Sequence, residues 1–206
     1  DRPLAWGVVT SVVLGALSLV PNLRSYPLSW SGVWGGYHGD MLFFESLATS
    51  LARFGPLDSI YSPDALIRYH WLTYAWSGEV SQAVGAEPFV VLTRVLPFAA
   101  VVGSCLLAVS WARRLSAVAW VPAFVVVLLV TGGYLGASYG AVFNFDSPSQ
   151  SMSVLWLLAF VIAVLAFAQM PGWGLGAAVA LFAFGLAGGK VSAGAVAVAA
   201  VIWLAL

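Results

Sequence analysis

Residues capable of proton transfer and ligand binding gather in one stretch of this apolar chain, "GGYHGDMLFFESLATSLARFGPLDSIYSPDALIRYHWL", which covers residues 35–72. The stretch contains the acidic residue Asp40 and both histidines of the chain, His38 and His70. A carboxylate can take a proton from a hydroxyl group. An imidazole can bind a metal or donate a hydrogen bond. These residue types point to proton transfer, or to phosphate or metal binding, within this stretch.

Asp40 opens a segment with helical spacing, "GDMLFFESLATSLARFG". Its apolar residues recur at i, i+3, i+4 and i+7, which predicts an amphipathic helix, and they are Phe44, Leu47, Ala48 and Leu51. We expect this helix to lie along the membrane surface with its apolar face down. Asp40 then occupies the N-cap position, where it either caps the helix or serves as a general base near the bilayer surface.

Glu45 lies five residues after Asp40 and therefore points in a different direction around the helix. It is a weaker candidate for proton transfer than Asp40. The alternatives for its side chain are contact with an acceptor or a lipid, and a solvated pairing with Thr49 or Arg53.

An aromatic segment, "RYHWLTYAW", follows the helix and places Arg68, Tyr69, His70 and Trp71 together. One reading is an interfacial aromatic belt in contact with lipid. The other is a binding site in which His70 holds a metal or a phosphate, Arg68 makes a two-pronged contact with a phosphate, and Tyr69 and Trp71 contact lipid or acceptor. His38 has the same two alternatives as His70, structural or ligand-binding.

Two further charged residues lie outside this stretch. Asp146, in "FNFDSPSQS", is the only acidic residue after Glu87, and its sequence context predicts a turn that leads into a helix. Asp40 and Asp146 together could hold a divalent cation such as Mg²⁺ or Mn²⁺, which prefer oxygen ligands. Lys190, in "GGKVSAG", interrupts an apolar run, and its alternatives are binding of a lipid phosphate and snorkelling to the membrane surface.

The composition shows which elements must position these residues. The 206-residue chain is 62% hydrophobic and 8% charged, whereas a soluble domain carries about 25% charged residues. The sequence therefore predicts an all-α, polytopic membrane helical bundle. Its net charge is zero, so nothing indicates binding of nucleic acid. The single cysteine, Cys105, lies in an apolar run and is expected in the core.

Membrane spans are predicted from apolar segments of about 20 residues. We expect a single transmembrane domain over residues 1–206, with an external loop at 22–87, and the chain is expected to continue beyond this piece. The predicted spans are residues 4–20, 89–111, 117–135, 152–168, 175–188 and 193–206, the last two being alternatively one broken helix.

Arg113 and Arg114 occupy the shortest clear loop, which places that loop and Arg2 on the cytoplasmic side. The polar connections 22–87 and 137–150 then lie on the external side of the membrane. Because helices must satisfy all backbone groups in lipid, the spans pack as a bundle. The glycines and alanines of the late spans are expected to allow close helix packing.

This pattern resembles the GT-C superfamily of integral-membrane glycosyltransferases, which includes protein O-mannosyltransferases and the aminoarabinose transferase of lipid A. Three features carry the resemblance, which covers roughly residues 1–190 as the N-terminal part of such a protein. A first span leads into a long external loop, an acidic residue opens an amphipathic helix in "GDMLFFESLATSL", and an aromatic-histidine cluster, "YHWLTYAW", precedes the next span. Asp146 in "FDSPSQ" fits as a second acidic residue. Several members of the superfamily carry an Asp followed directly by a Glu, whereas Asp40 is followed here by Met41.

The resemblance implies an enzyme of the plasma (inner) membrane of a bacterium. It implies transfer of a sugar from a polyprenyl-phosphate donor to an acceptor on the non-cytoplasmic face. Asp40 would be the catalytic base, Arg68, His70 and Lys190 would bind the donor phosphate, and Asp146 would hold a metal with Asp40.

Two other functions are consistent with the sequence. The interruption "GGKVSAG" is also typical of a transporter with a broken helix. The aromatic residues would alternatively serve as a contact surface in a non-catalytic subunit of a membrane complex.

Overall fold

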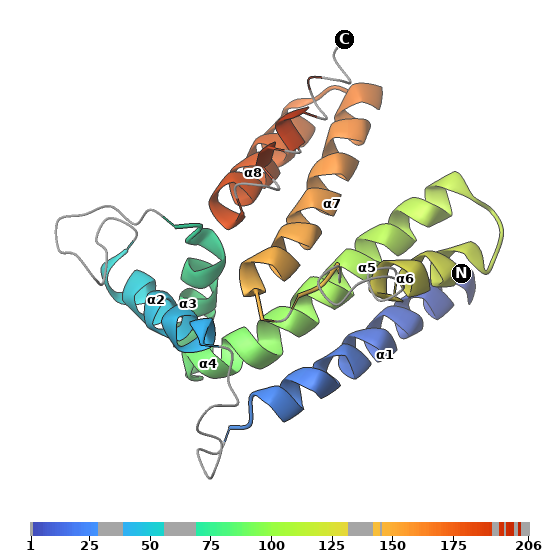
Figure 1. Cartoon of the computed structure of the whole chain (residues 1–206). Helices are drawn as coiled ribbons and strands as arrows, with labels where there is room; N and C mark the ends of the chain where they lie inside the picture. The colour runs from blue at the N-terminus through green and yellow to red at the C-terminus, as the bar shows by residue number, and fades with distance from the viewer. Residues whose placement is uncertain are drawn as a thin grey trace.

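The computed structural model describes residues 2–28, 39–55, 69–131, 142–144, 146–190, 194–195, 197–199 and 202. Every regular element in these residues is a helix, which confirms the predicted all-α class (Figure 1). In chain order the elements are α1 (Arg2–Ser25), α2 (Asp40–Phe54), α3 (Leu72–Val84), α4 (Pro88–Val90), η1 (Val91–Val95), α5 (Leu96–Leu115), α6 (Val121–Thr131), α7 (Pro148–Gln169) and α8 (Trp173–Gly189).

Three helices in these residues are long enough and apolar enough to cross a membrane, namely Leu4–Ser25, Pro88–Leu115 and Pro148–Gln169. The shortest has 22 residues, which at 1.5 Å per residue spans about 33 Å. The hydrocarbon core of a bilayer is about 30 Å thick. The chain is therefore built as a membrane protein. Two shorter apolar helices, α6 and α8, accompany these three.

The long helix formed by α4, η1 and α5 packs against α1 in the opposite direction (Figure 1). Gly7, near the start of α1, faces Val109 near the end of α5, and Gly15 faces Val102. A β-carbon added at Gly7 would lie 2.8 Å from Val109, so the two helices approach too closely for a larger residue. Helix α6 then folds back against both α1 and α5.

Helices α7 and α8 form a second pair, which packs on α5 through α7 (Figure 1). Trp156 of α7 covers Gly185 and Gly189 of α8. A β-carbon at Gly185 would lie 3.4 Å from the indole ring. Small residues thus allow close approach of these helices, as the composition of the late spans predicted.

Helices α2 and α3 pack against each other and against the start of the long helix. The four apolar residues of the predicted amphipathic face are all buried: Phe44, Leu47, Ala48 and Leu51. They share a core cluster with Tyr26, Tyr74, Leu92 and Leu96. The prediction of this face is confirmed, but the expectation that it rests on the membrane is wrong, because protein side chains already cover it.

The first helix does not end at Pro21, where the predicted span 4–20 stops, but continues to Ser25 with Pro21 inside it. Proline removes one helical hydrogen bond. The continuation is held instead by tertiary contacts, since the side-chain amide of Asn22 donates to the carbonyl of Thr93 at 3.0 Å. Asn22 is 2% exposed, so this bond lies in the interior.

The other predicted spans differ from the helices mainly at their ends. Residues 89–111, 152–168 and 175–188 lie within helices, and α6 covers residues 121–131 of the span predicted at 117–135. Most of 193–206 lies outside the described residues. The predicted loop 22–87 carries α2 and α3.

Candidate functional site

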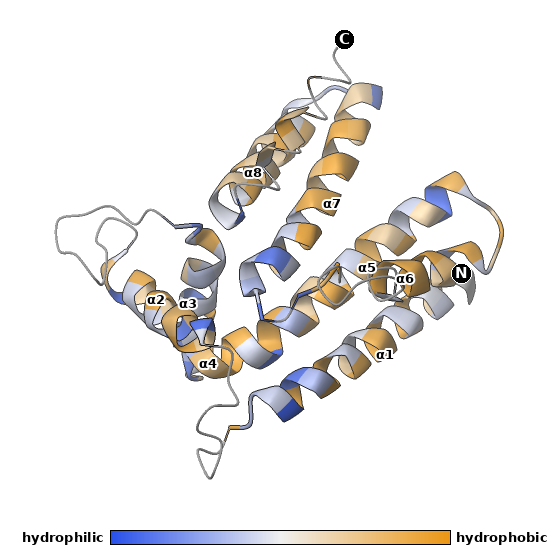
Figure 2. Cartoon of the chain, viewed as in Figure 1, coloured by the Kyte–Doolittle hydropathy of each residue, from blue (hydrophilic) through white to orange (hydrophobic). Residues whose placement is uncertain are grey.

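Hydrophilic residues concentrate at one end of the helical assembly (Figure 2). This polar end is formed by the last turn of α1, by α2 and α3, by the start of α7 and by the end of α8. All seven predicted site residues that the structure describes lie there: Asp40, Glu45, Tyr69, His70, Trp71, Asp146 and Lys190. Arg113 and Arg114 lie at the opposite end of α5.

Asp40 is the first residue of α2 and is exposed. The N-cap is Gly39 and no side chain caps this helix, so the prediction of Asp40 as the N-cap is wrong. A carboxylate in the first helical turn is stabilised by the helix dipole without a capping bond. The charge of Asp40 also helps to raise the pKa of the Tyr69 and Tyr74 hydroxyls, which places it beside the aromatic segment.

The aromatic segment is a packed cluster of rings. Tyr74 is fully buried and stacks on Phe44, with ring centroids 4.8 Å apart. Tyr69 lies over His70 at 3.7 Å and meets Phe43 edge-on at 5.5 Å. Trp71 is partly buried against the same core. Tyr69 is 38% exposed, so of these rings it is the one best placed to contact lipid or acceptor.

Burial, together with a smaller effect of the nearby charge of Lys190, lowers the pKa of His70 to about 4. The imidazole is therefore neutral at physiological pH. It can donate one hydrogen bond to a phosphate, but it brings no positive charge to the site.

Lys190 follows the last residue of α8 and reaches across to the start of α7. Its ammonium group lies 3.5 Å from the hydroxyl oxygen of Ser147 and 3.4 Å from the side-chain oxygen of Gln150. Burial lowers the pKa of this amine. Because Gly188 packs against Leu72, the end of α8 also touches the start of α3.

Asp146 is held by a residue 120 positions earlier in the chain. The Tyr26 hydroxyl donates to its carboxylate at 2.6 Å, and its backbone N–H donates to the Asn144 side chain at 3.0 Å. Tyr26 is 1% exposed. The prediction of a turn at Asp146 agrees with this geometry, and the carboxylate itself remains exposed.

Arg94 supports this arrangement from η1, a π-helical turn. Its guanidinium donates to the backbone carbonyls of Tyr26, Asn22 and Thr93, the last at 3.1 Å. It thereby provides a donor for the Tyr26 carbonyl just beyond the end of α1, and a second donor for the Asn22 carbonyl, which also accepts from the Tyr26 N–H. Such single π-turns often occur at functional sites.

Glu45 is half-buried and points towards the start of the long helix. Burial and the charge of Glu87 raise its pKa, while the backbone N–H of Phe89 lowers it. A carboxylate beside the N-terminus of a helix is favourable. Glu45 therefore helps to orient α2 against α4, and its predicted contact with acceptor or lipid stays a prediction.

Arg68 and His38, both predicted as ligand residues, lie outside the described residues. Among the described residues no three His, Cys, Asp or Glu side chains gather into a group that could hold a metal. No step below is derived through a metal, and the metal site of Asp40 and Asp146 stays a prediction.

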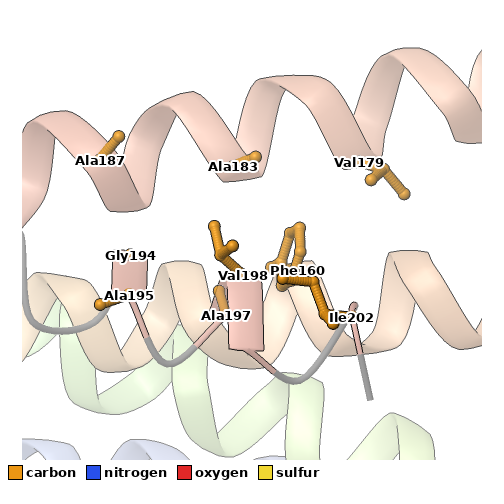
Figure 3. A pocket seen from close by; sticks show the side chains of 9 residues that line it. All are labelled: Phe160, Val179, Ala183, Ala187, Gly194, Ala195, Ala197, Val198 and Ile202. Atoms are coloured by element: carbon orange, nitrogen blue, oxygen red, sulfur yellow. The ribbon is translucent and has the colours of Figure 1, made fainter. Parts of the chain in front are cut away.

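An apolar cavity of about 550 Å³ lies between α7, α8 and five described residues that follow α8 (Figure 3), namely Gly194, Ala195, Ala197, Val198 and Ile202. Ala187 and Gly194 line one end of it and Val179 and Ile202 the other. The amide of Gly194 donates to the Lys190 carbonyl at 3.1 Å, so the cavity begins beside Lys190. Its lining suits a hydrocarbon chain.

Three residues of the polar end were not proposed as site residues from sequence: Tyr26, Arg94 and Ser149. Arg94 carried a signal, because a charged residue inside an apolar span is presumed functional. The partner of Tyr26 lies far along the chain, and no local pattern identifies it.

Comparison of the chain with protein-family models, with curated proteins and with solved structures found no match.

Proposed function

We propose that this chain is a membrane glycosyltransferase that moves a sugar from a polyprenyl-phosphate donor to an acceptor hydroxyl at the polar end. The observation that carries the proposal is the meeting of distant segments there. Asp40 opens α2, His70 precedes α3, Asp146 precedes α7, and Lys190 ends α8. A carboxylate, a neutral imidazole and an ammonium group are the groups that transfer from a phosphate leaving group requires.

Asp40 acts as the general base in this proposal. It is exposed and lies beside Tyr69 and Tyr74, so an acceptor can reach it. Asp40 takes the proton of the acceptor hydroxyl, whose oxygen forms a bond to the anomeric carbon of the sugar. The bond between that carbon and the phosphate oxygen breaks, and its electron pair leaves with the phosphate.

The leaving phosphate needs positive charge and hydrogen-bond donors. Lys190 supplies the positive charge, and the neutral imidazole of His70 supplies one hydrogen-bond donor. Arg68 is a further candidate from sequence. The apolar cavity beside Lys190 offers space for part of the donor's hydrocarbon chain. A lipid-borne donor also explains why the polar groups collect at the end of an apolar bundle.

We further propose that the polar end faces the non-cytoplasmic side of a bacterial plasma membrane. The support is that Arg113 and Arg114 lie at the other end of α5, beside the start of α1, and that short basic loops favour the cytoplasm.

One observation favours this function over transport. Transporters place ionisable groups near the middle of the membrane, on discontinuous helices. In the candidate spans that the structure describes, the charged residues lie near helix ends, namely Arg24, Arg94, Arg113 and Arg114.

The test is sugar transfer from a labelled polyprenyl-phosphate donor by membranes that contain the full-length protein. Asp40→Asn is expected to lower turnover by roughly 10²–10⁴-fold, the usual contribution of a general base. Glu79→Gln is the matched control, since Glu79 is an exposed carboxylate of α3, and it should leave turnover unchanged. Equal turnover of native protein and Asp40→Asn would remove Asp40 from the mechanism.

A further inference from the structure

The end of the assembly opposite to the polar end is basic. This basic end consists of the last turn of α5, which carries Arg113 and Arg114, the loop of residues 116–120 and the start of α6. The start of α1 packs beside it (Figure 1). The acidic residues that the structure describes all lie at the polar end, namely Asp40, Glu45, Glu79, Glu87 and Asp146. Within the described residues, the two arginine charges therefore have no carboxylate beside them.

The two arginines use their guanidinium groups differently. Arg113 turns towards the loop, where it donates to the backbone carbonyls of Ser116 and Ala117 at 3.4 and 3.5 Å. Arg114 is exposed, and it makes no hydrogen bond within the part of the chain that the structure describes. A guanidinium group carries five N–H donors in a planar fork, which matches the oxygens of a phosphate group. Arg114 is therefore placed to bind an anion from outside, while Arg113 holds the loop beside it.

Large apolar side chains lie exposed around these charges. Leu115 is 73% exposed and Trp120 is 62% exposed. Trp6, at the start of α1, is 67% exposed. Tryptophan rings are enriched where a bilayer meets water, and the candidate span Pro88–Leu115 ends at this point. The surroundings of Arg114 are therefore those of a residue at the level of the lipid headgroups.

We propose that the basic end binds the headgroup of an acidic phospholipid, with Arg114 on its phosphate and the exposed tryptophans beside its acyl chains. The occupant is a lipid because the site is continuous with the apolar surface of the span Pro88–Leu115. An acidic headgroup is preferred because a zwitterionic one brings a cation, which the two arginines repel. The inference does not depend on sugar transfer, since all its residues lie away from the polar end.

The size of the preference follows from the charges. One arginine near an anionic membrane surface favours binding by about fivefold, so two arginines favour an acidic lipid by about 25-fold. The attraction is electrostatic and acts between exposed groups. It is therefore screened in about 1 M salt, where the Debye length is about 3 Å.

A fluorophore in the loop reports lipid binding at this end alone. Val118 is exposed, so Val118→Cys in the full-length protein accepts a maleimide dye. The natural cysteine, Cys105, is fully buried, and native protein should take up no dye. The labelled protein in maltoside micelles is titrated with phosphatidylglycerol or phosphatidylcholine, each with a nitroxide quencher high on one acyl chain.

The two titrations are expected to differ at low salt. The half-quenching concentration of phosphatidylglycerol should be lower than that of phosphatidylcholine by about 25-fold, and the difference should nearly vanish in about 1 M salt. Equal half-quenching concentrations at low salt would overturn the proposal. A difference that survives high salt unchanged would contradict the electrostatic origin that it requires.

A matched pair of arginine variants tests the location of the lipid. Arg114→Gln should raise the half-quenching concentration of phosphatidylglycerol by about fivefold. Arg53→Gln is the control, because Arg53 is an exposed arginine in the last turn of α2, at the polar end, and it should leave the titration unchanged. An unchanged titration in Arg114→Gln, or equal losses in the two variants, would overturn the assignment of the lipid to the basic end.

Discussion

Replacing Tyr74 by phenylalanine tests what its buried hydroxyl contributes to the stability of the polar end. The change removes only the hydroxyl, and the ring keeps its stacking on Phe44 at 4.8 Å, a contact worth about 0.5–1.5 kcal/mol. Among the described residues this buried hydroxyl makes no well-formed hydrogen bond, although Ser149 and Tyr69 lie near it. A buried hydroxyl without such a bond costs roughly 1–3 kcal/mol of desolvation. We therefore expect the free energy of unfolding of Tyr74→Phe to stay level or to rise by about 1–2 kcal/mol.

Tyr26→Phe is the matched control with the opposite sign. The Tyr26 hydroxyl donates to the Asp146 carboxylate at 2.6 Å, and a hydrogen bond to a charged group contributes about 1.5–3 kcal/mol. Because Asp146 is exposed to solvent, we expect a loss near the lower bound, about 1–2 kcal/mol. Both rings are buried, so neither substitution changes the apolar contacts.

The assay is unfolding in mixed micelles of mild detergent and dodecyl sulfate, followed by far-ultraviolet circular dichroism for native protein and both variants. The reasoning requires Tyr26→Phe to lose stability, and Tyr74→Phe to keep or gain it. A loss of more than about 1 kcal/mol in Tyr74→Phe, of the size that a satisfied hydroxyl gives, would refute the description of Tyr74 as an unsatisfied donor.

Two further predictions concern packing and pH. Gly78→Ala should lower stability by about 1–3 kcal/mol through overpacking, because its β-carbon would lie 2.8 Å from that of Ala52; thermal unfolding in detergent measures this. The pKa of His70 is about 4, below its ordinary value of 6.5, so between these values the unfolded chain binds a proton that the folded chain does not. Stability should therefore fall as pH is lowered through this window, and His70→Gln should lessen the fall.

Each of these has its own control. Gly174 has open space around it, so Gly174→Ala should leave stability unchanged or raise it by about 0.5–1 kcal/mol through helix propensity; equal effects at Gly78 and Gly174 would count against the close packing of α2 and α3. For His70, parallel pH profiles of native protein and variant would show that its ionisation is not coupled to folding.

The sequence was sufficient for the fold class and for the buried face of α2. Both depend on local composition and spacing, which act within a few helical turns. Phe44 and Leu51, seven residues apart, face the same core as the spacing predicted. What covers that face was not predictable, because the residues that cover it, such as Tyr26, Tyr74 and Leu92, come from other helices. The contact of α3 with α2 also depends on the small size of Gly78.

The sequence predicted which residue types form the polar end, but it did not predict most of the contacts between them. Asp40, His70 and Lys190 drew attention because charged and polar side chains are rare in this chain. The bond between Tyr26 and Asp146 joins residues 120 positions apart, and the unsatisfied state of Ser149 depends on how α3 and α7 pack. Tertiary structure alone determines both.

The continuation of α1 past Pro21 has the same origin. A proline and an asparagine in succession are typical of a helix end. Here Asn22 and Arg94 make hydrogen bonds between helices, and these offset the hydrogen bond that proline removes. The partners of Asn22, namely Thr93 and Arg94, lie in η1. The sequence around Pro21 therefore did not predict that the helix continues.

The central claim is that Asp40 and Lys190 serve one site for sugar transfer, and a double-mutant cycle tests it most directly. Turnover from a polyprenyl-phosphate donor is measured for native protein, Asp40→Asn, Lys190→Gln and the double variant. Residues that act as a unit are strongly non-additive, so the double variant is predicted to lose little more than the more damaging single variant. Losses that multiply independently, or single variants with full turnover, would contradict a shared site.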